Sequence, residues 1–155
     1  MVTWFAGKQE QNGRHRLSGS ALFGQLSDRD LRIVDGFIHY RQFLAGEVIF
    51  DAGEEGQALY VIVHGKVAIC LPGQHESPLA ALQDNDFFGE LGLLDDWPRS
   101  AQARAAAPCE LAVLFRGDFE RLMASHGRIA SQIALQLARH LGRRLRQMLQ
   151  QAESP

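Results

Sequence analysis

The sequence is poor in cysteine and contains no long apolar run. Its two cysteines, Cys70 and Cys109, are far apart in apolar stretches and form no C-x-x-C motif, which favours buried free thiols over a disulfide framework or a zinc site. No apolar run approaches the roughly 20 residues of a membrane span, and the first residues lack an apolar core followed by a cleavage site. We therefore expect no membrane span and a soluble, cytoplasmic protein.

The sequence also lacks a charge excess and recognisable catalytic machinery. Sixteen basic against eighteen acidic residues give a formal net charge of -2, so no overall positive field is present to coat DNA. No H-x-H pair is available for a cupin-type metal site, and no nucleophile elbow is present. We expect neither catalytic residues nor metal ligands. The 155 residues, 46% of them hydrophobic, suit a single globular core.

The first part of the chain predicts an arm followed by helix. Residues 1–19 are polar and predict a loosely held N-terminal arm. Residues 20–37 carry apolar side chains at three- to five-residue intervals, which predicts one broken helix or two short ones. An S-x-x-D capping pattern runs from Ser27 to Asp30 and indicates where the second half of this helical segment begins.

The middle of the chain has the texture of β-structure. Short runs rich in valine, isoleucine, leucine and phenylalanine alternate with glycines, which is typical of a sandwich or roll. Residues 59–63 and 66–70 predict two strands around a tight turn at His64-Gly65, and residues 109–115 predict a further strand.

The helical period returns after Gly117. A short helix is expected first, and then a long one whose apolar stripe includes Ile129. The sequence therefore predicts an α+β fold over residues 20–155: an antiparallel, jelly-roll-like β-roll at about 38–116, preceded by an N-terminal helix and followed by two C-terminal helices at about 117–150, the last one long. We expect a homodimer because the stripe is long for a lone exposed helix. The predicted interface residues are Ile133, Leu137, Leu141, Leu145 and Met148.

Residues 86–105 carry the clearest chemistry. Gly89 permits close approach to the backbone, and N–H groups exposed at the following helical turn form an anion site. Arg99, Ser100 and Ala101 place a guanidinium, a hydroxyl and a small residue in one later turn, as a phosphate pocket requires. Glu90 suits a ligand that also carries a hydroxyl close to its phosphate, such as a ribose 2′-OH. The alternative is a Glu90–Arg99 ion pair beside a glycine that merely turns the chain.

The segment FGELGLLDDWPRSA resembles the phosphate-binding cassette of the cyclic nucleotide-binding domain family, whose pattern is roughly F-G-E-[LIM]-[AG]-L and then P-R-[STA]-A. The flanking segment at 44–70 is similar to the family's paired strands. The resemblance covers about Leu22 to Leu149, and GELGL, RSA and CELA are most similar to the bacterial catabolite activator branch.

The resemblance implies a role for each matching residue. The backbone of Gly89, Glu90 and Leu91 would receive the phosphate, and the Glu90 side chain would receive the ribose 2′-OH. The phosphate-binding arginine and the hydroxyl beside it correspond to Arg99 and Ser100. The apolar positions against sugar and base correspond to Ile69 and Leu79. Where the catabolite activator branch presents a Thr-Ser pair to adenine, this chain has Arg144 and Leu145.

The resemblance implies a non-enzymatic sensor that binds a 3′,5′-cyclic nucleotide and repositions its C-terminal helix, with cAMP favoured and cGMP as the second candidate. The catabolite activator branch continues into a helix-turn-helix domain after this helix, whereas the sequence stops at Pro155, so we expect no direct sequence-specific DNA binding. The sensor would act through an effector that the sequence does not identify. The alternative is a module of the same fold that binds a partner chain through the long helix without nucleotide. For Arg144, the expectation is contact with the purine or an exposed guanidinium at the helix surface.

Overall fold

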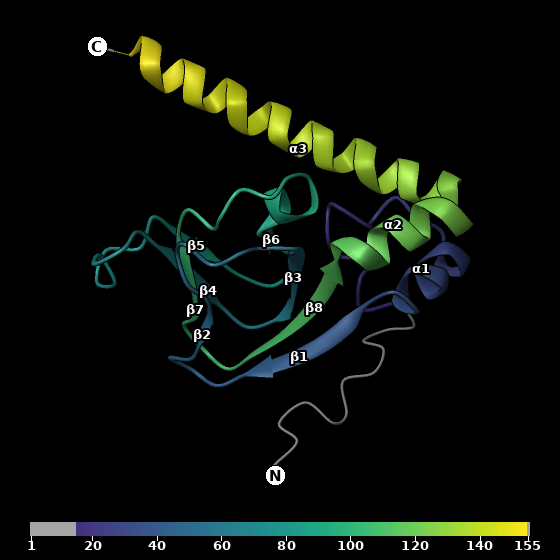
Figure 1. Ribbon diagram of the computed structural model, residues 1–155, viewed down its shortest axis with the longest axis horizontal. Coiled ribbons are helices and arrows are strands. Elements are labelled where there is room, and N and C mark those ends of the chain that lie inside the picture. Colours follow the sequence, from purple (N-terminus) through teal and green to yellow (C-terminus); the bar gives the residue numbers. More distant parts are fainter. Residues whose placement is uncertain (1–14, 155) are drawn as a thin grey trace.

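The computed structural model describes residues 15–154, and these fold into a β-roll with helices at one end and along one side (Figure 1). The α+β class, the antiparallel roll and the long last helix are confirmed. In chain order the elements are α1 (Asp28–Asp35), β1 (His39–Phe43), β2 (Val48–Phe50), β3 (Ala58–His64), β4 (Val67–Cys70), β5 (Ala80–Leu82), β6 (Phe87–Phe88), the 3₁₀ helix η2 (Glu90–Leu93), β7 (Gln102–Ala105), β8 (Cys109–Phe115), α2 (Arg116–Ser125) and α3 (Gly127–Glu153).

Two antiparallel four-stranded sheets form the roll. One has the order β1-β8-β3-β6 and the other β2-β7-β4-β5. Between them lies a core that includes Ile62, Phe88 and Leu111. A second core joins the β1-β8-β3-β6 sheet to the helices and includes Leu59 and Leu122. Burial of alternate side chains on opposite faces of β3 and β8 explains why one sheet serves both cores.

The strands on either side of His64-Gly65 are confirmed, but they do not form a hairpin. β3 belongs to one sheet and β4 to the other, so the turn carries the chain across the roll. Gly65 has a φ of +121°, and a β-carbon there would lie 2.6 Å from the carbonyl oxygen of Pro108. Only glycine fits this crossing. The two cysteines, Cys70 and Cys109, are free and buried as expected.

The N-terminal part differs from the expected arm and helix. The predicted arm extended to residue 19, yet Leu17 is fully buried in the core, and Arg16 pairs with Glu110 at 3.2 Å. Residues 16–26 form turns, and α1 is the only α-helix described before β1. Its start is confirmed, because the Ser27 hydroxyl accepts a hydrogen bond from the Asp30 N–H at 3.1 Å. The rest of the predicted arm lies outside the described residues.

The long helix has two halves with different surroundings. Its first half packs on the core, and its second half passes over the loop that contains η2 and projects beyond the roll (Figure 1). Ile133 and Leu137 are 0% and 3% exposed within this one chain, so their assignment to a dimer interface was wrong. Leu141 is partly buried against the same core, whereas Leu145 and Met148 are exposed.

Candidate functional site

All nine residues predicted for the site line one pocket of about 520 Å³ between the roll and α3. The β-roll, the η2 turn, the following loop and the long helix each contribute to its wall. These nine residues are Ile69, Leu79, Gly89, Glu90, Leu91, Arg99, Ser100, Ala101 and Arg144. The lining also includes residues that were not among the predicted site residues: Phe50, Ala80, Leu82, Phe87, Phe88, Gly92, Asp95, Trp97, Pro98, His140 and Gln147.

The cassette turn begins where β6 ends. Gly89 has a φ of +71°, a left-handed conformation that a residue with a β-carbon adopts at a cost, and the 3₁₀ helix η2 starts at the next residue. The predicted helical turn after Gly89 is therefore present as a single short 3₁₀ segment. Its second residue, Leu91, is 53% exposed, so the turn is accessible from the pocket.

The guanidinium of Arg99 is held before any ligand arrives. Its Nη1 atom donates to the carbonyl oxygen of Gly89 at 3.0 Å, and its Nη2 atom donates to that of Ala58 at 2.8 Å. Its Cζ lies 4.2 Å from the ring centroid of Phe50, a cation–π contact. Burial lowers the pKa of Arg99 from its ordinary value, which nearby Tyr60 and Glu90 oppose. Arg99 is therefore held by contacts within the protein and not by water alone.

Three glycines give the Arg99 side chain its space. A β-carbon on Gly56 would lie 2.0 Å from the Nε of Arg99, one on Gly89 would lie 2.8 Å from Nη1, and one on Gly92 would lie 3.0 Å from the same atom. The packed backbone thus forms a cradle around the guanidinium.

Glu90 does not pair with Arg99. Its side chain is 6% exposed, and its Oε1 atom accepts a hydrogen bond from Nη1 of Arg144 at 2.7 Å. The Nε2 atom of His140 lies 3.9 Å from the same oxygen. The alternative of a Glu90–Arg99 ion pair is therefore wrong. Arg144 pairs with Glu90 in this structure, and its contact with a purine stays a prediction.

The sequence analysis missed His140. It lies one helical turn before Arg144, with its ring centroid 4.4 Å from that of Phe87. Burial lowers the pKa of His140, Glu90 opposes this shift, and Arg144 and Arg143 add to it. The four-residue spacing to Arg144 was the signal that could have placed this residue at the pocket.

The opposite wall of the pocket is apolar. Ile69 on β4 and Leu82 on β5 are partly buried, whereas Leu79, just before β5, is 66% exposed. Trp97 is 78% exposed on the loop between η2 and Arg99. The flat face of an aromatic group such as a purine would bury these side chains. Leu145, paired with Arg144 by the resemblance, is not part of the pocket lining.

Arg116 ties the end of the cassette turn to the helices. It is the first residue of α2, and its Nε and Nη2 atoms donate to the carbonyl oxygen of Gly92 at 3.2 and 2.8 Å. It also donates to the carbonyl oxygen of Asp95 and to the Asp96 carboxylate, the latter at 2.5 Å. The loop after η2 is thus fastened to the start of α2.

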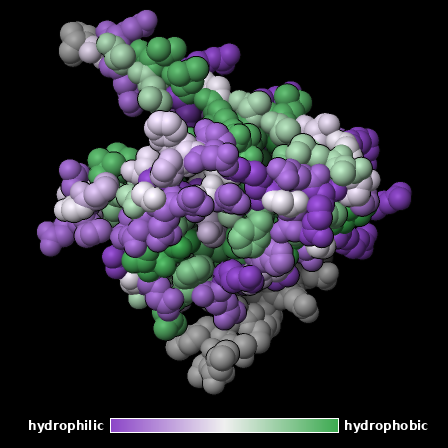
Figure 2. Space-filling model, in the orientation of Figure 1, coloured by the Kyte–Doolittle hydropathy of each residue, from purple (hydrophilic) through white to green (hydrophobic). Residues whose placement is uncertain are grey.

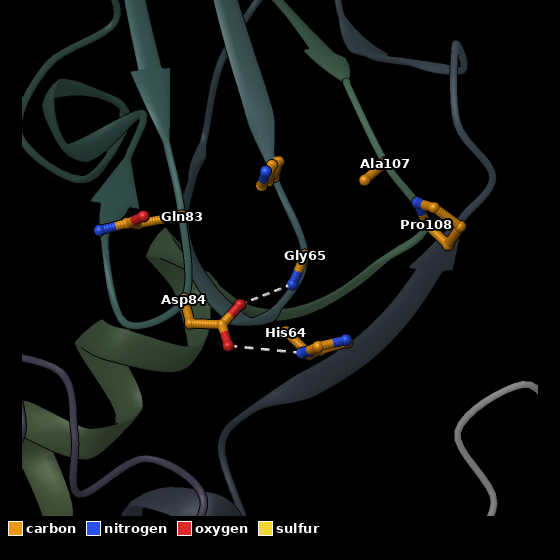
Figure 3. Close-up of a pocket in the computed structure, with 7 residues that line it drawn as sticks. His64, Gly65, Gln83, Asp84, Ala107 and Pro108 are labelled. Atoms are coloured by element: carbon orange, nitrogen blue, oxygen red, sulfur yellow. Dashed lines mark hydrogen bonds and ion pairs between the residues drawn. The ribbon is translucent and has the colours of Figure 1, made fainter.

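A second hollow of about 530 Å³ lies at the His64-Gly65 crossing (Figure 3). Asp84 points toward the crossing there: one carboxylate oxygen accepts the Gly65 N–H at 2.8 Å and the other lies 3.4 Å from Nδ1 of His64. These contacts hold the crossing in place. None of the predicted site residues lines this hollow, so we assign the functional site to the pocket at the cassette.

Residues 15–154 contain neither a cluster of metal-ligating side chains nor a membrane-spanning helix. Within this range, no group of three or more histidine, cysteine, aspartate and glutamate side chains is arranged to hold a metal ion. Across the same residues, no helix combines the length and apolar character needed to cross a bilayer.

Comparison with known proteins points to the same part of the chain. Residues 40–126 match the family model described as a cyclic nucleotide-binding domain. The chain is 37% identical over 120 residues to the cyclic AMP receptor protein of Thermus thermophilus, covering 76% of this chain and 56% of that protein. It is 40% identical over 82 residues to a cAMP-dependent protein kinase regulatory subunit of Emericella nidulans, covering 53% of this chain and 20% of that one.

The fold agrees with these matches. The crystal structure of the Thermus thermophilus catabolite activator protein superimposes with a TM-score of 0.77 at 36% identity, over 86% of this chain and 62% of that one. The chain thus spans about half the length of the first of these relatives and a fifth of the second. Because the family model matches more than half of the sequence, across the strands and the cassette turn that build the pocket, the chain belongs to the cyclic nucleotide-binding domain family.

Proposed function

We propose that this chain is a non-enzymatic regulatory module that binds a 3′,5′-cyclic nucleotide in the cassette pocket, with cAMP favoured over cGMP. The observation that carries the proposal is the separation of charge within one pocket: a held guanidinium, Arg99, and a buried carboxylate, Glu90, do not pair with each other. A ligand that carries both an anion and a hydroxyl donor complements such a pocket.

Each part of a cyclic nucleotide has a counterpart in the pocket. The cyclic phosphate carries one negative charge, which Arg99, the Ser100 hydroxyl and the backbone N–H groups from Gly89 to Leu91 would receive. The ribose 2′-OH would donate to Glu90, and the base would lie against Ile69 and Leu79. The ionised carboxylate of Glu90 would favour a ligand that carries a hydroxyl at this position over one that carries a second phosphate. It accepts a hydrogen bond from the hydroxyl and repels the phosphate.

We favour cAMP because the two relatives described above carry cAMP in their names. Calorimetric titration with cAMP and with cGMP tests both the binding of a cyclic nucleotide and the preference for cAMP. We expect cAMP to bind at micromolar Kd or tighter, about -8 kcal/mol, and more tightly than cGMP. Flat titrations with both nucleotides at millimolar concentration would overturn the function and favour the alternative, a partner-binding module without nucleotide. Tighter cGMP binding would overturn only the preference.

We further propose that the module is a homodimer through a corrected seam on α3. Exposed or half-exposed apolar residues recur there at alternating spacings of four and three, the period of a coiled coil. Apolar surface is visible on the projecting part of α3, intermixed with polar side chains (Figure 2). The effector that such a dimer would act on is not defined by this surface. The seam residues are Ala134, Ala138, Leu141, Leu145 and Met148.

A further inference from the structure

The two charged side chains of the cassette pocket lie close together and yet do not pair. Nη1 of Arg99 donates to the carbonyl oxygen of Gly89, which belongs to the peptide that leads into Glu90, and Arg99 and Glu90 line one pocket. We propose that Arg144 keeps Glu90 off Arg99, so that the phosphate subsite and the ribose subsite both stay open for a ligand. This inference rests on the proposed function.

Arg144 holds Glu90 from the helix side by one carboxylate oxygen. Its Nη1 atom donates to Oε1 at 2.7 Å, which gives the 6% exposed carboxylate a charged partner. No group among residues 15–154 hydrogen-bonds Oε2, and no buried polar side-chain atom in this range lacks a partner. Oε2 is therefore accessible, and a ribose hydroxyl can donate to it while Arg144 stays on Oε1.

Removal of Arg144 would leave Glu90 with one strong partner nearby. His140 is its other basic neighbour, but Nε2 of His140 is 3.9 Å from Oε1, and burial lowers the pKa of this histidine, which favours the neutral ring. A neutral imidazole does not offset the charge of a buried carboxylate. The guanidinium of Arg99 carries the required charge in the same pocket. The carboxylate would then turn toward Arg99, and the groups meant for the phosphate and the hydroxyl would bond each other instead.

The position of Arg144 makes this separation of charge depend on the helix. Arg144 lies in the projecting half of α3, 54 positions after Glu90, which lies on the short η2 turn. The pair exists only while this half of α3 passes over the loop that contains η2 (Figure 1). Arg144 is thus a positioning residue, because it acts on the ligand through Glu90.

The test measures the Kd of cAMP and of 2′-deoxy-cAMP by calorimetry in the wild type, Arg144→Gln, Glu90→Gln and the double variant. We expect Arg144→Gln to bind both nucleotides about fivefold more weakly, the upper range for a partly exposed ion pair, because Glu90 then competes for Arg99. The double variant has no such competitor, so it should bind each nucleotide within about threefold of Glu90→Gln. Arg144→Lys should recover part of the loss, because lysine keeps the charge without the guanidinium geometry.

The matched control is Arg146→Gln, which removes the same charge two residues away. Arg146 is exposed and makes no ion pair with any residue in 15–154, so this variant should bind as the wild type does. A loss in Arg144→Gln that persists in full in the double variant would show that Arg144 acts without Glu90, and would overturn the inference while nucleotide binding stands. Affinities of Arg144→Gln equal to those of Arg146→Gln would overturn it as well. A wild type that binds neither nucleotide would overturn the proposed function and this inference with it.

Discussion

Gly56 lies against the guanidinium of Arg99 so closely that a β-carbon on the glycine would be 2.0 Å from Nε and 2.4 Å from Cζ. Gly56 is 43 residues before Arg99 in the sequence, on the loop that precedes β3. The side chain that we propose to bind the phosphate is therefore positioned by a glycine outside the motif.

This contact makes Gly56→Ala a selective probe of the phosphate subsite. The methyl group overlaps the flexible arginine side chain, so we expect Arg99 to move out of its cradle while the fold is kept. Cyclic nucleotide affinity should fall at least tenfold, and the Tm should fall as well, because the displaced arginine no longer donates to the carbonyls of Gly89 and Ala58. Gly117→Ala is a useful control, because a β-carbon there meets nothing within 4 Å and the glycine does not have a positive φ. Unchanged affinity in Gly56→Ala would contradict the assigned position of Arg99.

Replacing Arg99 itself should affect binding and stability together. Arg99→Ala should cost about 2 to 5 kcal/mol of binding, because the cyclic phosphate loses its charged partner. The ligand-free protein should also melt at a lower temperature, since the variant loses the contact with Phe50 and leaves the carbonyls of Gly89 and Ala58 without their donor.

Arg99→Lys separates these two effects. The lysine keeps the charge but cannot donate to two carbonyls in the planar geometry of a guanidinium, so we expect intermediate affinity. Calorimetry and thermal melting on the three proteins check the order. An Arg99→Ala affinity within threefold of the wild type would reject the phosphate role.

The pH dependence of stability should report His140. Burial favours its neutral form, so its pKa is lower in the folded protein than the value of 6.5 in the unfolded chain. As the pH falls below about 6.5, the unfolded state binds the proton first, and this residue's contribution to the free energy of unfolding is lost progressively. Above about pH 6.5, His140 is neutral in both the folded and the unfolded state, so its contribution to the free energy of unfolding is fully present.

Urea unfolding between pH 7.5 and 5 measures the effect. His140→Phe keeps a ring against Phe87 and removes the titration, so its stability should decline less steeply with acid than that of the wild type. The control is His75→Gln, which replaces an exposed histidine in the loop between β4 and β5. Parallel curves for the wild type and His140→Phe would show that His140 does not titrate differently on folding.

The proposed seam on α3 predicts a charge-sensitive dimer. Leu145 is 57% exposed in the single chain, and burial of this remaining surface between two helices would contribute about 1 to 2 kcal/mol for each subunit. We expect sedimentation equilibrium to show a dimer for the wild type and a monomer for Leu145→Glu. Gln150→Glu adds the same charge on another side of the helix and should remain dimeric. A monomeric wild type would rule out the seam.

What the sequence could predict was decided by distance along the chain. Gly89, Glu90 and Arg99 lie within eleven residues and form a local motif, so their chemistry could be inferred and they do meet in the pocket. The partner of Arg144 could not be inferred, because it depends on the direction in which α3 crosses the roll. The same limit applies to His140.

The helix stripe shows why periodicity alone was insufficient. Ile133, Leu137 and Leu145 share a regular spacing, but the first two lie on the domain and the third lies beyond it. Spacing identifies a face of a helix and not what covers it. Likewise, the apolar runs before and after His64-Gly65 identified two strands, while the sheet that each joins is set by long-range pairing with β8 and β7.

The fastening at Arg116 has a mechanical consequence. One guanidinium bonds the end of η2 and its following loop to the residue where α2 starts, and α2 leads directly into α3. If the cassette turn shifts, the charge-assisted hydrogen bonds of Arg116 are kept only when the start of α2 shifts with it. We therefore expect any shift of the cassette turn to be passed through Arg116 to the start of α2 and from there to α3, as a short lever arm moves a long one.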